Sequence, residues 1–366
     1  MHVCLICIEL FGIGIHGGFG KATRFIGREL VRRGIKVTVV VPRRSHDYPK
    51  VYELDGMTVF QCSPYSPWST LALYQSCAAN IYHSQDTSFG TYLAMTAMPD
   101  RRHIITFRDP MDKNDWRIEN EFSDKGGIGW YLYRLYIDNP LVSSAIRRAH
   151  SLYCAAEFLI PKVTRKYTLS STPKFLPTPV AIPDTVSKAE RPTVCFVSRW
   201  ERRKRPELFL EITRKFPKVD FIAVGGAQDK KRDSYLRKTY SGIPNLEMTG
   251  VIDQFCTENL NRILEKSWIL INTSPREGLP NAFLEAAAHR CAILSYTDPD
   301  CFASQFGYYV RGGSIEEGLD FLLSGDRWRV FGECGYQHVN RFFAVEKAME
   351  AHLEAYEAQS CYAQRS

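Results

Sequence analysis

The chain has 366 residues, of which 45% are hydrophobic and 24% are charged. These proportions are typical of globular proteins and exclude a disordered, collagen-like or coiled-coil chain. A single hydrophobic core rarely grows beyond about 250–300 residues, so the length predicts two domains. The formal net charge of +7 favours anionic partners such as phosphorylated ligands or lipid headgroups, and we expect no nucleic acid partner.

The sequence indicates a cytoplasmic protein. No window approaches the roughly 18 uninterrupted apolar residues of a transmembrane helix. The N-terminus runs directly into an apolar strand pattern, without the basic segment and cleavage site of a signal peptide. Cys4 and Cys7 form a lone C-x-x-C pair inside an apparent strand, so we expect buried thiols rather than a zinc or redox site.

The first part of the chain predicts one β-α-β unit. Apolar residues at 3–8 form a strand pattern, apolar positions over 22–31 recur at helical spacing, and Gly34 stands where a helix C-cap glycine belongs. Residues 35–41 predict the next strand. Strands alternating with helices imply a parallel sheet. Further strand ends are expected at residues 81–83 and 103–107.

The second half repeats this alternation. A proline-rich stretch over residues 173–192 cannot be a continuous helix or a central strand, so we predict it as the linker between two domains. A helix is predicted over 280–289, and the pattern is helical from about Trp328 onward. The chain is therefore predicted to contain two doubly wound α/β halves. The strands predicted after the linker are 193–198, 220–224, 267–272 and 291–295.

A glycine-rich loop lies between the first predicted strand and helix. Gly12, Gly14 and Gly17 spell G-x-G-x-x-G, in which backbone N–H groups and a helix N-terminus hold a pyrophosphate. The acidic residue expected at the end of the second strand is missing, and Arg43 and Arg44 stand there instead, which would suit a 2′-phosphate. Three interpretations stay open: an NADP site, a plain flexible loop, or a loop that lets a ligand approach the backbone.

A basic stretch follows the strand predicted at 193–198. Arg199 and Lys204 are five residues apart across a turn, so their charged groups can converge on one anion at the carboxyl end of that strand. The alternative is a solvated basic run, which is the commoner case for a charge cluster. The other basic residues are expected at surface or supporting positions: Arg202, Arg203 and Arg205.

Two glutamates flank the start of the helix predicted at 280–289. Glu277 precedes the helix, and Glu285 lies about one and a half turns into it. Free amides at residues 278–281, together with the helix dipole, favour phosphate oxygens. The two carboxylates can then accept hydroxyl hydrogens from a sugar and a ribose, with the pyrophosphate between them. The alternatives are an exposed helical glutamate and an ordinary acid at a helix N-terminus.

Together these stretches resemble the retaining glycosyltransferases of family 4. The motifs that carry the resemblance are E-x7-E at Glu277 and Glu285, R-x4-K at Arg199 and Lys204, and the glycine loop at Gly17-Gly18. The resemblance covers most of the chain and implies the GT-B fold, with two Rossmann-like, doubly wound parallel-sheet domains facing a cleft. The implied domains are an acceptor-side domain at 1–185, a nucleotide-sugar-binding domain at 186–342, and a helix at 343–366 that crosses back to the first domain.

The resemblance assigns roles by position. Arg199, Lys204 and Glu277 are the catalytic candidates: the two cations would neutralise the leaving diphosphate, and the carboxylate would bind sugar hydroxyls. Glu285 would bind the ribose. The further donor-binding candidates are Gly17, Gly18, Val251, Gly278, Leu279, Pro280 and Asn281.

The implied reaction moves a hexose from a UDP- or GDP-sugar to a hydroxyl of a glycan, lipid-linked or small-molecule acceptor. It retains the anomeric configuration, the leaving phosphate takes the acceptor proton, and no protein nucleophile is required. We expect no cofactor and no metal. The alternatives left open are a non-hydrolysing sugar-nucleotide epimerase, an NADP-dependent oxidoreductase and a non-catalytic nucleotide-sugar-binding protein.

One position departs from the family pattern. Arg108, followed by Asp109, stands after a predicted strand where many relatives carry a histidine. The candidates for contacts to the sugar or the acceptor are therefore Arg108, Asp109, His83 and His16. Aromatic and basic residues over 128–150 suggest a peripheral contact with the cytoplasmic membrane face, and a buried helix with a basic outer face is the alternative.

Overall fold

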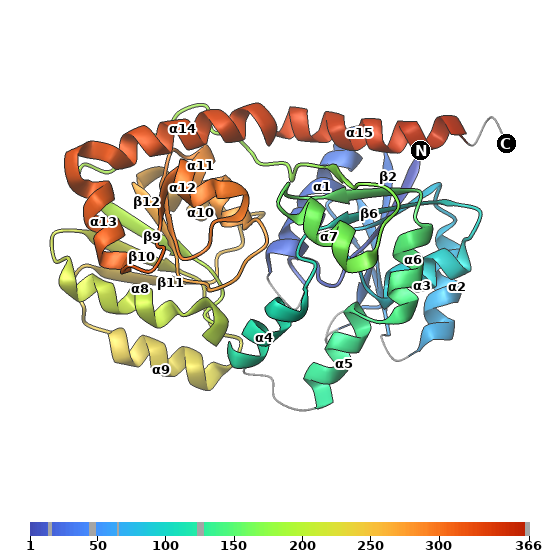
Figure 1. Cartoon of the computed structure of the whole chain (residues 1–366), viewed down its shortest axis with the longest axis horizontal. Helices are drawn as coiled ribbons and strands as arrows, with labels where there is room; N and C mark the ends of the chain where they lie inside the picture. The colour runs from blue at the N-terminus through green and yellow to red at the C-terminus, as the bar shows by residue number, and fades with distance from the viewer. Residues whose placement is uncertain (14–16, 44–48, 64–65, 123–127, 363–366) are drawn as a thin grey trace. The chain divides into compact units, whose positions relative to one another are not determined.

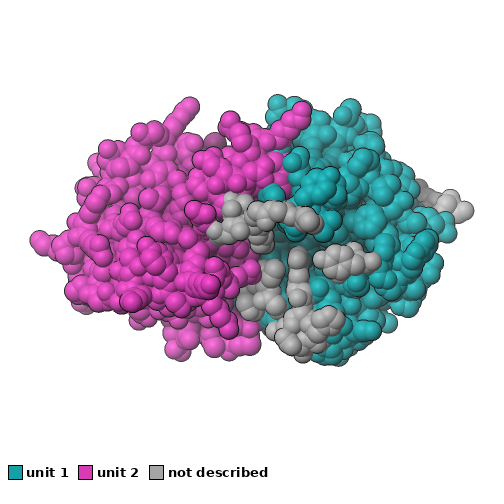
Figure 2. All heavy atoms as spheres, turned by 90° about the horizontal axis from the view of Figure 1, so that it is seen from below, with its two compact units in different colours: residues 1–112, 125–179, 346–366 teal, residues 113–124, 180–345 magenta. Residues whose placement is uncertain are grey.

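The computed structural model describes residues 1–13, 17–43, 49–63, 66–122 and 128–362. The chain divides into two compact units, which are coloured separately in Figure 2. The first unit comprises residues 1–112, 125–179 and 346–366, and the second comprises residues 113–124 and 180–345. Each unit is thus assembled from separated pieces of the sequence.

In the described residues, the first unit is built on an eight-stranded sheet with the order β3-β4-β2-β1-β5-β6-β7-β8 (Figure 1). Its strands are β1 (His2–Ile6), β2 (Lys36–Pro42), β3 (Val51–Leu54), β4 (Met57–Cys62), β5 (Ile81–Ser84), β6 (Arg102–Phe107), β7 (Ser151–Cys154) and β8 (Lys174–Phe175). Its helices are α1 (Gly18–Arg32), α2 (Pro67–Cys77), α3 (Phe89–Ala97), α5 (Ile128–Ile137), α6 (Pro140–Arg148), α7 (Leu159–Tyr167) and α15 (Val345–Tyr362).

The predicted β-α-β unit at the start of the chain is confirmed. β1 pairs in parallel with β2, from His2 opposite Lys36 to Ile6 opposite Val40. After α1, Gly34 has a φ of +76°, the left-handed conformation that favours glycine at the end of a helix. β1 is a nearly continuous apolar run because strands in the middle of a parallel sheet are covered on both faces.

One edge of this sheet corrects the expectation of purely parallel pairing. β3 and β4 form an antiparallel hairpin. Asp55 and Gly56 connect them with φ values of 52° and 79°, as a two-residue type I′ turn requires. Arg24 Nε donates to Asp55 Oδ2 at 2.7 Å, which ties the hairpin to α1. The Asp-Gly dipeptide is the local signal for this hairpin, and hydrophobic periodicity alone does not reveal it.

The second unit contains a six-stranded parallel sheet, again counted over the described ranges, in the order β11-β10-β9-β12-β13-β14. Its strands are β9 (Thr193–Val197), β10 (Asp220–Val224), β11 (Leu246–Gly250), β12 (Ile269–Asn272), β13 (Ala292–Ser295) and β14 (Gly307–Tyr309). The four strands predicted after the linker are therefore confirmed as β9, β10, β12 and β13. Its helices are α4 (Lys113–Phe122), α8 (Pro206–Ile212), α9 (Lys230–Tyr240), α10 (Asn259–Lys266), α11 (Asn281–Ala288), α12 (Phe302–Gln305), α13 (Ile315–Leu323) and α14 (Arg327–Phe342), with 3₁₀ turns η1 (Arg202–Lys204), η2 (Thr213–Lys215), η3 (Pro299–Cys301) and η4 (Ser324–Asp326).

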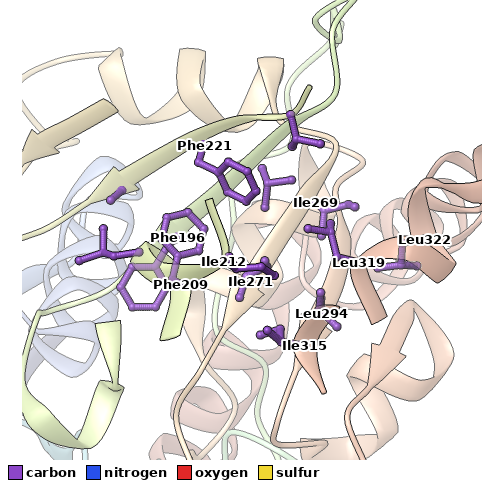
Figure 3. Close-up of a cluster of buried hydrophobic side chains, with 14 of the residues drawn as sticks. Phe196, Phe209, Ile212, Phe221, Ile269, Ile271, Leu294, Ile315, Leu319 and Leu322 are labelled. Carbon is purple, nitrogen blue, oxygen red and sulfur yellow. The ribbon is translucent and has the colours of Figure 1, made fainter. Parts of the chain in front are cut away.

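A cluster of buried apolar side chains forms the core of the second unit (Figure 3). Phe196 on β9 stacks on Phe209 of α8 with ring centroids 5.1 Å apart, and Phe209 meets Phe221 of β10 edge-on at 5.7 Å. Truncating a buried aromatic ring of this kind typically costs about 3–5 kcal/mol. This packing fixes the strands whose carboxyl ends carry the loops described below.

Helices α5 and α6 differ in exposure. On α5, Tyr131 is 62% exposed, Leu132 46% and Leu135 41%, so the buried-helix alternative is wrong for α5. On α6, Val142 and Ile146 are buried, as that alternative expects. Across the described ranges, none of the helices combines the length and the apolar character that a membrane span requires.

Candidate functional site

Two loops of the second unit leave the same edge of its sheet. β9 and β12 are parallel neighbours, so the loops that follow them begin at the carboxyl edge, where ligands bind in open α/β sheets. The loop after β9 forms η1 and carries Lys204, and the loop after β12 carries Glu277. Thr273 Oγ1 donates to the Arg205 carbonyl at 3.0 Å, and Arg205 Nε donates to the Thr273 carbonyl at 2.5 Å. These two hydrogen bonds hold the loops together.

Lys204 and Glu277 form an ion pair between Nζ and Oε1, and their side chains are only 14% and 11% exposed. Burial, and then the nearby Arg203 guanidinium, lower the pKa of Lys204 to about 8. Burial acts to raise the pKa of Glu277, but the Lys204 ammonium and the Arg203 guanidinium lower it to about 2. The site therefore combines a firmly ionised carboxylate with a lysine that releases its proton more readily than usual.

Arg203 is a third charged member of this site. Its Nη1 donates to the Arg276 carbonyl at 2.9 Å and to Ser274 Oγ at 3.2 Å, and lies 3.9 Å from Glu277 Oε2. The sequence predicts a surface or supporting position for Arg203, and the structure shows support: the side chain braces the loop after β12.

Two carboxylates of α4 complete the network. Asp115 Oδ1 lies 3.0 Å from Arg276 Nε, while Glu119 Oε1 lies 2.9 Å from Arg203 Nε and 3.0 Å from Arg276 Nη1. The sequence analysis missed both acids. The available signal is their i, i+4 spacing, which places them on one face of a helix.

Arg199 forms an ion pair within its own loop. Its Nη1 lies 3.1 Å from Glu201 Oε1, and its side chain is 30% exposed. Its guanidinium is nevertheless among the charges that lower the pKa of Lys204, after burial and Arg203. Arg199 and Lys204, the two cations predicted to bind one anion, are thus close enough for their charges to interact.

Helix α11 begins at Asn281, one residue later than predicted, with Pro280 as its N-cap. Proline offers no capping side chain, so the positive end of the helix dipole is not screened by one. Gly278 is buried, and Leu279, Pro280 and Asn281 are partly exposed. Glu285 is partly buried inside the helix, as the E-x7-E spacing predicts.

The predicted base-contact residue lies on an exposed turn. Val251 follows β11 and is 59% exposed, and Gly250 before it has a φ of +88°. Arg237 donates to the carbonyls of Met248 and Gly225, each at 3.3 Å, and so joins β11 to the turn after β10. The turns after β10 and β11 lie at the carboxyl edge of the sheet.

In the first unit, the glycine loop lies against a carboxylate. Gly17 is the N-cap of α1, and Gly20 N–H donates to Glu9 Oε1 at 3.1 Å. A Cβ at Gly17 would lie 2.0 Å from that same oxygen, so a larger residue here would displace the Glu9 carboxylate from its present position. Gly18 is exposed. Glu9 therefore occupies the helix N-terminus where the dinucleotide interpretation places a pyrophosphate. The other loop candidates, Gly14 and His16, lie outside the described residues.

His83 lies in the core of the first unit rather than at a ligand-facing position. It is fully buried, with Nδ1 2.8 Å from Tyr356 Oη and Nε2 2.7 Å from Thr106 Oγ1. Burial, and then the nearby His352 and Arg108, hold the pKa of His83 well below its usual range. Because both ring nitrogens have protein partners, the predicted contact to a sugar or acceptor is not supported. His83 instead joins the sheet to α15.

Arg108 is also tied into this core. It is 6% exposed, and it donates to Thr178 Oγ1 at 2.9 Å and to Gln85 Oε1 at 2.5 Å. Burial lowers its pKa to about 10. Asp109 follows at a partly exposed position after β6. The structure thus brings Arg108 together with buried neutral groups, and leaves Asp109 as the more accessible of the two candidates.

Comparison with known proteins identifies the fold. Residues 191–318, which lie in the second unit, match the family model described as "Glycosyl transferases group 1". Sucrose-phosphate synthase from Thermosynechococcus elongatus has a TM-score of 0.74 at 14% identity, over 99% of each chain. HepE of Anabaena, in complex with UDP-glucose, has a TM-score of 0.72 at 10% identity, over 97% of this chain and 99% of that chain.

A third similar structure is a mutant of TarM from S. aureus in complex with Fondaparinux, alpha-GlcNAc-glycerol and UDP. Its TM-score is 0.67 at 11% identity, over 97% of this chain and 99% of that chain. No curated protein sequence gives a significant match. The predicted GT-B fold is therefore confirmed, while membership of family 4 stays a prediction.

Proposed function

We propose that this protein is a retaining glycosyltransferase that moves a hexose from a nucleotide-diphosphate sugar to an acceptor hydroxyl. The observation that carries the proposal is the buried Lys204–Glu277 pair at the carboxyl edge of the sheet, in the unit that matches group 1 glycosyl transferases. A nucleotide sugar offers complementary groups to both members of the pair: an anionic diphosphate and the hydroxyls of a sugar.

Lys204 is suited to a departing diphosphate. When the bond from the sugar C1 to the phosphate oxygen breaks, negative charge grows on the leaving group, and a cation in a largely desolvated site stabilises it. An anion beside Lys204 raises its pKa from about 8 and so keeps the lysine protonated during the reaction. Arg199, at the start of the same loop, supplies a second cation with a guanidinium fork that fits phosphate oxygens.

Glu277 is suited to holding the donor sugar. Its pKa of about 2 keeps it ionised, so it accepts hydrogen bonds and does not donate them. Lys204 engages Oε1, Arg203 lies 3.9 Å from Oε2, and Ser274 is a further hydrogen-bond partner of the carboxylate. A carboxylate has about four acceptor positions, so we assign a remaining one of Glu277 to a sugar hydroxyl, and we assign Glu285 to the ribose. Backbone groups of Gly278, Leu279, Pro280 and Asn281 would bind the phosphates or the sugar, Gly17 and Gly18 would also contact the donor, and Val251 would contact the base.

The reaction needs no protein nucleophile. The acceptor oxygen attacks C1 on the face from which the phosphate departs, and the acceptor proton passes to the leaving phosphate oxygen, so the anomeric configuration is retained. Glu277 fits this scheme because an ion-paired carboxylate with a pKa of about 2 is a weak base at neutral pH.

We infer a UDP-sugar as the donor, because the similar structures of HepE and TarM contain UDP-glucose and UDP. The proposed acceptor is a hydroxyl of a glycan or a lipid-linked saccharide in the cytoplasm. The exposed Tyr131, Leu132 and Leu135 of α5 support a peripheral contact with the membrane that would carry a lipid-linked acceptor. We expect activity without added metal or cofactor, and EDTA in the assay tests this.

The first test is a thermal-shift panel with UDP, GDP, ADP, their common sugar conjugates and NADPH. A ligand at 100 times its Kd adds about 2.7 kcal/mol, which is a shift of several degrees. We expect one UDP-sugar to raise Tm, and Glu277→Gln and Arg199→Ala to weaken this shift. Glu247→Gln, at an exposed position on β11, is the matched control and should keep it.

The second test is transfer from that donor to an acceptor panel, with the anomeric configuration of the product determined by NMR. An inverted product would contradict the retaining step, and conversion of the donor without an acceptor would identify an epimerase. If NADPH alone raises Tm, and Glu277→Gln and Arg199→Ala do not change that shift, the result would support an oxidoreductase function for the glycine loop.

A further inference from the structure

Helix α4 belongs to the second unit although its sequence lies inside the first. Residues 113–124 interrupt two segments of the first unit, 1–112 and 125–179, and Figure 2 colours the described ones, 113–122, with the second. Within the second unit, α4 (teal in Figure 1) packs against η1, the turn that ends with Lys204. A helix from the first half of the sequence therefore supports the loop that holds the donor-site lysine.

Glu119 of α4 joins the two loops of the site. Its Oε1 lies 2.9 Å from Arg203 Nε in the loop after β9, and 3.0 Å from Arg276 Nη1 in the loop after β12. Its side chain is 15% exposed. A largely buried carboxylate between two guanidinium groups forms charge-assisted hydrogen bonds, which are about twice as strong as neutral ones. Glu119 thus fixes the separation of the two loops.

The position of Arg203 decides which group Glu277 contacts. Arg203 is bonded to Glu119 and lies 3.9 Å from Glu277 Oε2. If the Glu119 carboxylate is removed, Arg203 can pair instead with Glu277, which it already faces. A guanidinium can bind a carboxylate through two parallel hydrogen bonds, whereas a lysine acts as a point charge. Arg203 would then compete with Lys204 and with the donor sugar for Glu277.

We propose that Glu119 is a positioning residue for sugar transfer, which holds Arg203 and Arg276 so that the Glu277 carboxylate serves Lys204 and the donor sugar. This inference rests on the proposed function. Glu119 acts through the two arginines and takes part in no bond that forms or breaks. Its loss changes the geometry of the Lys204–Glu277 pair and leaves both residues in place.

The direct test is the kinetics of Glu119→Gln with the donor identified by thermal shift. We expect kcat to fall about tenfold or more, with the donor KM changing less than about threefold, because the altered geometry matters most when charge develops on the leaving group. Glu121→Gln neutralises an exposed acid on the same helix and should stay within about twofold of wild type.

The pH profile separates positioning from a loss of stability. The charged groups that face Lys204 are Glu277 from the loop after β12, Arg203 in η1 and Arg199 after β9, with Glu119 of α4 behind Arg203. Donor kcat/KM, which reports the free protein, requires protonated Lys204 and so declines as pH rises through its pKa. If Arg203 takes over Glu277, the pKa of Lys204 falls, and the decline moves to lower pH in Glu119→Gln. A variant that is merely less stable keeps the decline where wild type has it.

A double-mutant cycle tests whether Glu119 acts through Arg203. In an Arg203→Gln background there is no competing guanidinium near Glu277, and Arg276 keeps its ion pair with Asp115, so adding Glu119→Gln should change kcat by less than about twofold. A further loss of about tenfold in that background overturns the proposal. The double variant also removes a buried charge together with its partner, so it remains measurable if Glu119→Gln alone fails to fold.

The outcomes distinguish the inference from the proposed function. If wild type transfers sugar and Glu119→Gln matches Glu121→Gln in kcat and pH profile, the positioning role fails and the proposed function stands. If wild type transfers sugar from no nucleotide sugar, the proposed function fails and the inference fails with it.

Discussion

The two units each contain a buried polar network, and the networks are built differently. In the second unit, Lys204, Glu277 and Arg203 are charged groups that face one another at the edge of the sheet. In the first unit, His83 has a pKa well below its usual range, so it is neutral at physiological pH, and it is hydrogen-bonded to Tyr356 in the core. One network consists of opposed charges. The other, here called the neutral network, consists of uncharged groups around His83, and the Arg108 guanidinium is bound to it through Gln85.

This difference indicates which network can respond to a ligand. Desolvation of an ion pair offsets most of the attraction between its charges, so an anionic ligand can take over a cation at small net cost. The uncharged groups around His83 offer an anion no opposite charge, and Arg108 beside them already donates to Thr178 and Gln85. This network contributes stability because leaving a hydrogen-bonded member unpaired is costly. We therefore assign chemistry to the charged network and structural support to the neutral one.

The largest expected effect comes from making the charged network neutral. In a Lys204→Met, Glu277→Gln double variant, two uncharged side chains of similar size replace the ion pair. We expect transfer to fall by a factor of about 10² to 10³, because the leaving diphosphate and the sugar both lose a contact. Tm should stay near wild type, since neutral replacements of a buried pair are tolerated. Initial rates and thermal melts check both; retained activity would break the assignment of chemistry to this pair.

The next largest effect is expected in the neutral network. Tyr356→Phe removes the hydroxyl beside His83 Nδ1 and leaves a buried ring nitrogen without that partner. We expect the free energy of unfolding to fall by about 1–3 kcal/mol, with kcat within about twofold of wild type. Urea denaturation measures the first quantity. Tyr235→Phe, at a residue 63% exposed on α9, is the matched control and should leave both unchanged.

The networks should also respond to pH in opposite directions. Burial first, and then Arg108, lower the pKa of His352 to about 3, and His83 is likewise depressed. Because the unfolded state binds these protons near pH 6.5, stability is lost as pH falls below about 6.5. Lys204, with a pKa of about 8 in the free protein, instead makes kcat/KM for the donor fall as pH rises above about 8. Tm and kcat/KM across pH check these signs, and a Tm independent of pH between about 7 and 5 would contradict the first.

The smallest effect is expected from an ion pair in water. Arg33 Nη2 lies 2.8 Å from Glu346 Oε2 at the start of α15, and the Glu346 side chain is 85% exposed. Exposed pairs typically contribute about 0–1 kcal/mol. Glu346→Gln should therefore change the free energy of unfolding by less than about 1 kcal/mol, and even less at high salt. A larger loss of the free energy of unfolding, measured by urea denaturation, would contradict the small contribution expected of an exposed ion pair.

Much of the fold could be predicted from the sequence because its strands are short apolar runs between glycines, prolines and amphipathic helices. Residues 220–224 were predicted as a strand, and β10 spans Asp220–Val224. The unit to which α4 belongs could not be predicted. It depends on contacts such as Glu119 with Arg276, which are 157 residues apart and leave no local pattern.

Part of the candidate site could be predicted because its motifs are local. R-x4-K places Lys204 in the loop after β9, and E-x7-E places Glu277 in the loop after β12. These strands are parallel neighbours, so both loops begin at the same edge of the sheet. His83 was a poor candidate because its sequence position, at the end of a strand, does not show whether the side chain points to solvent or to another helix. Tyr356 lies 273 residues away, and only the folded chain places it beside His83.

The piecewise assembly of the units has a consequence for synthesis on the ribosome. The first unit begins at Met1, yet it includes residues 346–366, and the hydrogen bond between His83 and Tyr356 cannot form until the second unit has been translated. The sheet of the first unit therefore lacks its contacts with α15 while the more than 160 residues between Pro179 and Glu346 are translated. The domain that starts first is the one that finishes last, and a ribosome stalled before α15 would leave it incomplete and exposed to chaperones and proteases.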